Sequence, residues 1–320
     1  MNAPQAPSIS VIDPINPAIE WARTILFRPF DLGKWFVIGF SAWLAQLGSG
    51  GGNGGGGGRD GARYNVDPGN LRHEIDHVWR YVTANLDWII PVAVAAAVVF
   101  IGLWLLFLWL SSRGRFMFLY CVARNKAEVT NPWHRFQHHA SSLFAFRAVL
   151  GLITLGAAIA PFVLGGIVVS VSTVTLGFTP LTILAIVGAV IYFLAVLIVS
   201  GVIAKFTKDF IVPIMYLRAV SATEAWRSFL DVLSVNKGRF ALYILVQMAI
   251  AIAITTMMVL AACCTCCLAA CLFALPYIGT VVLLPVHVFT RSYSLYYLAQ
   301  YGPQFNVFEP QRGETTATNP

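Results

Sequence analysis

Long apolar runs alternate with short polar and charged stretches along the chain. Six of these runs contain few or no charged side chains, as is typical of α-helices that cross a hydrocarbon core about 30 Å thick. They cover residues 31–47, 88–110, 148–171, 181–204, 240–262 and 278–298. The first is short, because Pro29, Asp31 and Gly33 interrupt the pattern before Trp35. The pattern therefore predicts an all-α, polytopic membrane protein with six transmembrane helices.

The basic residues between these runs predict the orientation of the helices. Seventeen of the 21 Lys and Arg residues lie in alternate polar stretches, which begin with the one before the first run. The opposite side contains only Arg59, Arg63, Arg72 and Arg80. Because cytoplasmic loops are enriched in Lys and Arg, we expect three hairpins with both termini in the cytoplasm of a bacterial cell. Five or seven spans would place a basic loop outside the inner membrane.

Each hairpin is preceded by a stretch with the apolar period of an amphipathic helix, expected at the cytoplasmic membrane interface. The second of these stretches has Asn131 as a candidate cap and Pro132 as the first helical residue. The third begins with Ser221 and Glu224 in capping-box spacing. The apolar stripes are Ile19, Trp21, Ala22, Ile25 and Leu26; then Trp133, Phe136, Ala140, Leu143 and Phe144; then Trp226, Phe229, Leu230 and Leu233.

The three elbow-and-hairpin units align with one another. Trp21 precedes Gly33 and Lys34 by the same separation as Trp226 precedes Gly238 and Arg239. Gene duplication explains this similarity, and so does the shared need for a Trp anchor and basic residues at a membrane surface. The predicted organisation is a disordered tail (1–13), one membrane domain (14–302) with units 14–126, 127–218 and 219–302 and a Gly-rich extracytoplasmic loop (48–62), and a C-terminal tail (303–320).

The composition is typical of a membrane protein, and the distribution of charge indicates which molecules the protein binds. Hydrophobic residues make up 58% of the chain and charged residues 11%, and the mean hydropathy is +0.73. A soluble domain has about 25% charged residues. The net charge of +7 is distributed at the ends of apolar runs and not on one face, so we expect anionic lipid headgroups and other membrane proteins as partners, and no nucleic acid.

One motif suggests metal catalysis. His73, Glu74 and His77 match the H-E-x-x-H pattern, in which two histidines bind zinc and the glutamate activates water. The charged Asp76 is unusual within that motif, and no third ligand is evident. We favour a solvated amphipathic helix over residues 70–86, and we expect neither a metal nor a cofactor.

Five of the six cysteines cluster near the outer end of the fifth run: Cys263, Cys264, Cys266, Cys267 and Cys271. Three of them share one helical face, and small side chains that allow close helix packing are the simplest interpretation. A disulfide remains open because the outer side is oxidising. A thiolate metal site is the least favoured, since sulfurs this close in sequence reach tetrahedral positions only with an abrupt turn.

Polar groups inside the predicted spans are scarce. No Asp, Glu, Lys or Arg lies well inside a run, whereas such residues usually mark ion or proton routes. Gln247 and His287 are the strongest candidates for membrane-embedded polar sites, and a hydrogen bond within the bundle is the simplest role for either. A carboxylate-driven pump is therefore not expected.

Two segments resemble a known group of proteins. The segments Pro29-Phe30-Asp31-Leu32-Gly33-Lys34-Trp35-Phe36 and Leu284-Pro285 through Tyr297 are similar to those of uncharacterised bacterial six-span membrane proteins, a group related to the membrane domain of glycerophosphodiester phosphodiesterases. The resemblance implies the membrane part alone, because no stretch is long or polar enough to form the phosphodiesterase domain. No catalytic residue can be transferred from it.

These observations favour a non-catalytic scaffold or accessory protein in a membrane or lipid-related process. A carrier of small solutes or lipids is the alternative, since transporters often contain repeats. A membrane zinc protease ranks third and depends on the H-E-x-x-H motif alone.

Overall fold

The structure is a computed structural model of the chain and describes residues 9–47, 80–81, 83–175, 180–265 and 275–308. Every regular element of these residues is helical, which confirms the all-α prediction. The elements are α1 (Ile15–Phe27), α2 (Leu32–Gln46), α4 (Leu86–Arg124), α5 (Thr130–Arg135), α6 (Gln137–Thr175), α7 (Pro180–Phe206), the π-helix η1 (Thr207–Ile211), α8 (Val212–Arg218), α9 (Ala222–Val235), α10 (Lys237–Cys264), α12 (Pro276–Val282), α13 (Leu284–Ala299) and the 3₁₀-helix η2 (Pro303–Phe305).

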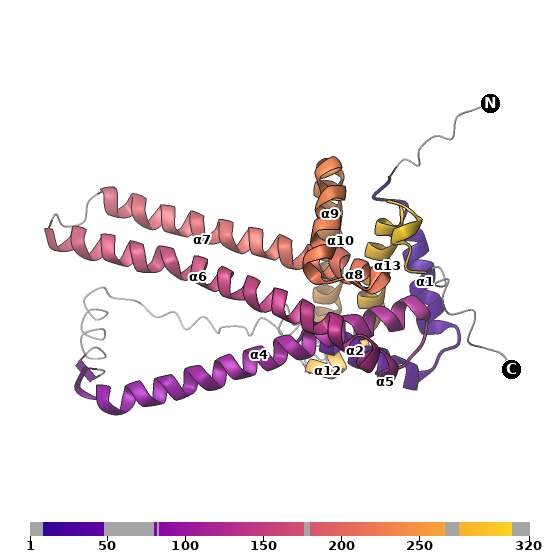
Figure 1. The fold of residues 1–320 in the computed structure, drawn as a ribbon, viewed down its shortest axis with the longest axis horizontal. Coiled ribbons are helices and arrows are strands. Elements are labelled where there is room, and N and C mark those ends of the chain that lie inside the picture. Colours follow the sequence, from indigo (N-terminus) through magenta and orange to yellow (C-terminus); the bar gives the residue numbers. More distant parts are fainter. Residues whose placement is uncertain (1–8, 48–79, 82, 176–179, 266–274, 309–320) are drawn as a thin grey trace.

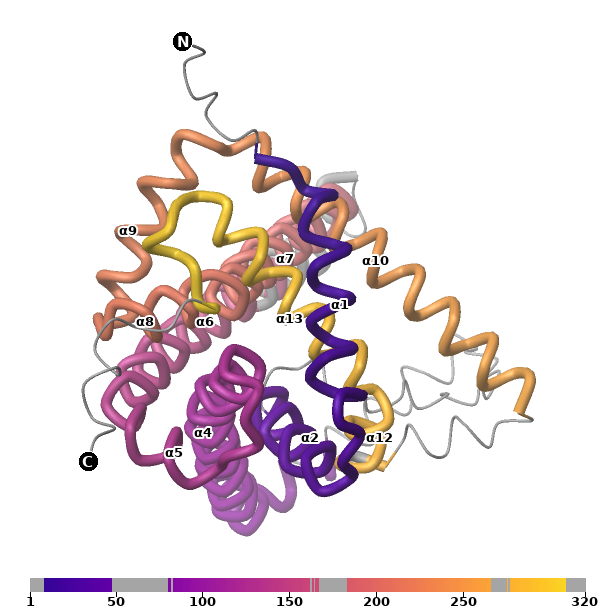
Figure 2. Tube along the Cα trace, turned by 90° about the vertical axis from the view of Figure 1, so that its right-hand side faces the viewer, coloured from indigo at the N-terminus to yellow at the C-terminus, as the bar shows by residue number. Residues whose placement is uncertain are grey.

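Long helices project from a compact region, and α4, α6 and α7 extend to the same side of it (Figure 1). We call α4, α6, α7 and α10 the arms, and the compact region, formed by α1, α2, η1, α8, α9, α13 and the adjoining arm ends, the hub. The arms α6 and α7 run side by side, whereas α10 leaves the hub in another direction (Figure 2). The four arms correspond to the predicted second to fifth spans, and each is long and apolar enough to cross a membrane. Few or no residues of their most apolar windows are buried, as expected of helices that face lipid.

The predicted first and sixth spans form shorter helices. The helix α2 has 15 residues, and the predicted sixth span is divided into α12, with 7 residues, and α13, with 16. The division falls at Leu283, because Pro285 occupies the first turn of α13 and cannot donate a backbone hydrogen bond there. Among the described residues, the number of helices that meet the length for a crossing is therefore four.

The helix α13 lies at the centre of the hub, in contact with α1, α2, α4 and η1. Its side chains Tyr293, Leu295 and Tyr297 are completely buried. The Tyr297 hydroxyl lies 2.9 Å from that of Tyr301, and burial together with this hydrogen bond raises the pKa of Tyr301 above its ordinary value. The hub thus has an aromatic core in which the tyrosines are neutral hydrogen-bonding groups.

The predicted amphipathic helices all form, but they pack differently from one another. In α9 the Ser221 and Glu224 capping box is present, as predicted. The predicted cap at Asn131 is wrong, because α5 begins at Thr130, two residues before the predicted start at Pro132. The Asn131 side chain donates instead to the Glu128 carboxylate. The second elbow is divided at Phe136: its first part forms α5, and its second part, with Ala140 and Leu143, forms the beginning of α6, which continues into the third span.

The helix α1 turns its apolar stripe towards protein. Ala18, Ile25 and Leu26 are fully buried, and the Trp21 indole donates to the Val122 carbonyl oxygen at 3.0 Å. This helix lies along α13 (Figure 2). The amphipathic pattern is therefore satisfied by packing within the hub.

The hub extends beyond both ends of the predicted membrane domain. The Ser10 backbone and the Gln300 side chain exchange two hydrogen bonds of 2.8 and 2.9 Å. Val11 and Val307, which the sequence places in the tails, are buried. Both described ends of the chain consequently lie together in the hub.

The ends of the first two predicted units share a backbone feature. The helices α4 and α8 each end with an Arg that is followed by a non-glycine residue in the left-handed region, Asn125 and Ala219, both with φ of 53°. The Asn125 side chain accepts a hydrogen bond from Lys34 Nζ at 2.7 Å. In both units, this turn leads the chain towards the next amphipathic helix.

A glycine permits the close contact between α2 and α4. A Cβ atom at Gly114 would lie 2.5 Å from the backbone nitrogen of Ala45 and from the backbone carbon of Leu44. The backbones therefore approach closely, and Ser111 donates from α4 to the Ala45 carbonyl oxygen at 3.0 Å. The short helix α2 is held to α4 by this contact.

We predict that Gly114→Ala destabilises the protein by about 2 kcal/mol, because the new methyl group would overlap backbone atoms of α2 and force the helices apart. Gly102→Ala is the matched control, since no atom lies within 4 Å of its added Cβ. The thermal midpoint of both variants, measured in nonionic detergent, checks the prediction. Equal midpoints would show that α2 and α4 are not in this contact.

Candidate functional site

The most unusual local structure of the hub is the π-helical turn η1, which joins α7 to α8. The Val212 amide donates to the Thr207 carbonyl oxygen, five residues earlier. Pro213 follows and has no N–H for the carbonyl of Lys208, five residues before it. Such π-turns are frequent at functional sites. Here the turn leaves the Lys208 carbonyl available to a partner outside its own helix.

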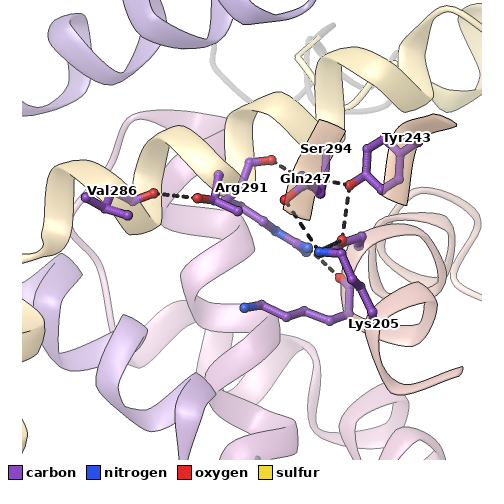
Figure 3. A network of polar contacts seen from close by, with 9 residues as sticks. Lys205, Tyr243, Gln247, Val286, Arg291 and Ser294 are labelled. Atoms are coloured by element: carbon purple, nitrogen blue, oxygen red, sulfur yellow. Dashed lines mark hydrogen bonds and ion pairs between the residues drawn. The ribbon is translucent and has the colours of Figure 1, made fainter. Parts of the chain in front are cut away.

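Asp209 lies within this turn and is 3% exposed. Its Oδ2 atom forms an ion pair with Lys205 Nζ at 3.0 Å and accepts a hydrogen bond from the Tyr243 hydroxyl at 3.0 Å. The Gln247 amide donates to the same hydroxyl at 3.1 Å (Figure 3). The carboxylate is therefore anchored from both α7 and α10.

Further cations reach this region from three other helices. Arg291 on α13 donates to the free Lys208 carbonyl oxygen (Figure 3). Arg147 on α6 donates to the hydroxyls of Ser111 and Ser112 on α4, at 3.2 and 3.1 Å. Arg115 on α4 is 6% exposed and forms no hydrogen bond with any residue that the structure describes. Arg115 lies within electrostatic range of Arg147, Arg291 and Asp209.

We call Arg115, Arg147, Lys205, Lys208, Asp209 and Arg291 the charged cluster. Five of its members are cations and one is an anion. Lys205 neutralises Asp209, so the other four cations have no carboxylate partner within the cluster. Buried charges are costly unless they are paired. The cluster is thus an electropositive region at the point where the arms meet the hub.

The cluster is better suited to structure and binding than to catalysis. General acid–base chemistry needs a group that can gain and lose a proton next to a reacting atom. Asp209 is the only carboxylate here, and it is already bonded to an ammonium group and a phenol. Its chemical role is to compensate part of the positive charge and to align the helices that supply the cations.

The structure brings one predicted polar residue into this network. Gln247 is 6% exposed and also lies 3.5 Å from Lys205 Nζ. His287 lies within electrostatic range of Lys208 and approaches the Gln46 amide at 3.2 Å. Both Gln247 and His287 line a small cavity of about 170 Å³ between α10 and α13, together with Thr255 and Thr290.

The other candidate site residues from the sequence do not form a second site among the described residues. Cys263 and Cys264 are free and exposed at the end of α10. Cys266, Cys267 and Cys271 lie outside the described residues, as do His73, Glu74, His77 and the Gly-rich loop 48–62. Among the residues that the structure does describe, no three His, Cys, Asp or Glu side chains group in a way that could hold a metal ion.

Sequence reasoning missed Arg115, Asp209 and Arg291 as members of a site. Arg115 looks like an ordinary positive-inside residue, and so does Arg291, which lies towards the end of the predicted sixth span. Asp209 gave a usable signal, because it is the only acidic residue between Glu128 and Glu224 and stands four residues after Lys205. A solitary carboxylate in such a long apolar region is a candidate for a buried ion pair.

Exposed apolar arms around a polar, aromatic hub define a helical membrane protein. The chain belongs to a family of unknown function, DUF7544, whose sequence model matches residues 9–278. No curated protein and no solved structure matches it. The family match does not connect the chain with the membrane domain of glycerophosphodiester phosphodiesterases, so that resemblance is not confirmed.

We predict that Asp209→Asn destabilises the protein by about 3 kcal/mol, because removal of one partner of a buried pair leaves uncompensated charge. Asn has nearly the same shape as Asp and keeps an oxygen that can accept the Tyr243 hydrogen bond. The loss of stability therefore measures the effect of removing the charge. The control is Asp231→Asn on α9, where the aspartate is exposed. Thermal unfolding in detergent measures both, and a midpoint for Asp209→Asn no lower than that of the control would contradict the assignment.

Proposed function

We propose that this protein is a non-catalytic scaffold or accessory of the bacterial inner membrane. In this proposal the hub faces the cytoplasm, and the exposed arms bind lipids and the helices of partner membrane proteins. The basic residues of the hub support this orientation through the positive-inside rule. The proximity of Ser10 and Gln300 supports two termini on the same side.

The observation behind this proposal is the contrast between arms and hub. Large apolar side chains of the arms are exposed, for example Val98, Ile191 and Ile252 at 65, 62 and 64%. In the hub, by comparison, the charged and aromatic groups contact one another. An apolar surface of this extent on separated helices is suited to contact with lipid and with other transmembrane helices.

We propose that α2 and the pair α12–α13 complete the predicted six spans, with α2 held against α4 and α12. The Tyr277 hydroxyl of α12 donates to the Phe36 carbonyl oxygen of α2 at 3.0 Å, and a Cβ at Gly39 would lie 2.7 Å from Val281. Phe36, Phe40 and Tyr277 form an aromatic group of the kind found at membrane interfaces. Local thinning of the bilayer accommodates the 15 residues of α2.

The scaffold proposal predicts a fixed set of neighbours around the arms. A photocrosslinking amino acid at Val98 on α4 and at Ile191 on α7 should yield the same discrete protein adducts in cell membranes. At Val235 of α9, which is 81% exposed in the hub, these adducts should be absent. Adducts only with lipid at both arm positions would contradict the scaffold role.

The cavity lined by Gln247 and His287 favours the carrier as a second candidate. A carrier must open this cavity to each side of the membrane in turn. In a variant whose native cysteines are replaced, Thr255→Cys tests this with membrane-impermeant maleimide. The scaffold proposal predicts labelling from one side at most in oriented vesicles. Labelling from both sides would replace the scaffold by the carrier.

A further inference from the structure

Two arginines form the inner part of the charged cluster. Arg115 and Arg291 are 6 and 5% exposed, and the Nε atom of each is buried without a hydrogen-bond partner. A guanidinium group has five N–H donors. Arg115 uses none of them on the described residues, and Arg291 uses one on the Lys208 carbonyl. Unsatisfied donors of this kind are costly in a folded protein.

The outer part of the cluster is open. Lys208 is exposed and has no hydrogen-bond partner among the described residues, and Arg147 is half-buried. Lys208 lies within electrostatic range of Arg115 and Arg291. Lys208 and Arg147 are thus the more accessible of the four cations, and Arg115 and Arg291 are the less accessible ones.

We propose that the charged cluster binds one phosphate group among Arg115, Arg147, Lys208 and Arg291. Four cations from α4, α6, η1 and α13 surround the region, and the sole carboxylate is already paired with Lys205. A phosphate group has several acceptor oxygens and at least one negative charge, so it satisfies donors from several directions at once. It would thereby compensate the positive charge of the cluster that Asp209 does not neutralise.

The location of the cluster indicates where the phosphate comes from. The four cations lie where the apolar parts of the arms end, which is the depth of lipid headgroups in a membrane-spanning chain. An anionic phospholipid and free inorganic phosphate offer the same chemistry, and the experiment distinguishes them. This inference concerns binding by the hub and does not depend on the scaffold role of the arms.

The test uses the purified full-length chain in nonionic detergent and in lipid nanodiscs. In detergent, the thermal midpoint is measured against inorganic phosphate, with chloride at equal ionic strength as reference. In nanodiscs, phosphatidylcholine alone is compared with a mixture that contains phosphatidylglycerol. Native mass spectrometry of the purified chain shows whether a phospholipid already occupies the site.

Two substitutions at the more accessible cations test the assignment and leave the two buried arginines in place. Lys208→Gln and Arg147→Gln should each weaken binding about tenfold, because each removes a charged contact with the anion. Lys126→Gln is the matched control, since Lys126 is an exposed lysine on the loop after α4, outside the cluster. Its affinity should equal that of the unmodified chain.

Stabilisation by phosphate or retention of phosphatidylglycerol, reduced in both cluster variants and unchanged in the control, supports the proposal. A response to phosphatidylglycerol alone assigns the site to a lipid headgroup, and a response to inorganic phosphate alone assigns it to the free anion. The absence of both responses overturns the proposal. An equal loss in Lys126→Gln also overturns it, because binding would then reflect general surface charge.

Discussion

The pairing of one buried carboxylate with surrounding cations is the interaction on which the hub depends. Asp209 bonds to Lys205 in its own helix and to Tyr243 in α10, and the adjoining Lys208 carbonyl bonds to Arg291 in α13. Three helices that are distant in sequence are thereby fixed around a single π-turn. Without the carboxylate, the same helices would bring only positive charges together, and their repulsion in a low-dielectric interior would oppose assembly.

Aromatic packing lies against the buried side of this polar centre. Phe210, next to Asp209, stacks on Phe229 of α9 with a centroid distance of 5.1 Å, and Tyr243 stacks on Tyr297 of α13 at 4.7 Å. The residues flanking the charge thus provide apolar contact on one side and hydrogen bonds on the other. Polar groups are concentrated inside the hub and apolar groups outside on the arms, an arrangement suited to a lipid environment.

Much of the architecture follows from local sequence, but the site does not. Uninterrupted apolar runs predicted the four arms, and the Ser221 and Glu224 spacing predicted the start of α9. An amphipathic stripe indicates only that one face of a helix avoids water. It does not distinguish a face that lies on the membrane from one that packs on protein, as α1 does on α13. The charged cluster joins residues from Arg115 to Arg291, and periodicity along the chain contains no information about such distant contacts. The partner of the Lys208 carbonyl in the π-turn Thr207–Ile211 is Arg291, which is likewise far away in sequence.

The length of α4 and α6 has a mechanical consequence. Each has 39 residues, or about 58 Å of helix, which is nearly twice the thickness of a bilayer core. Pro91 and Pro161 both lie towards the far ends of these helices, so the segments next to the hub contain no proline. Arg115 and Arg147 lie on these segments, near the hub ends of α4 and α6. A change in bilayer thickness that tilts the arms would therefore alter the spacing of the two guanidinium groups, and the hub would respond to the physical state of the lipid.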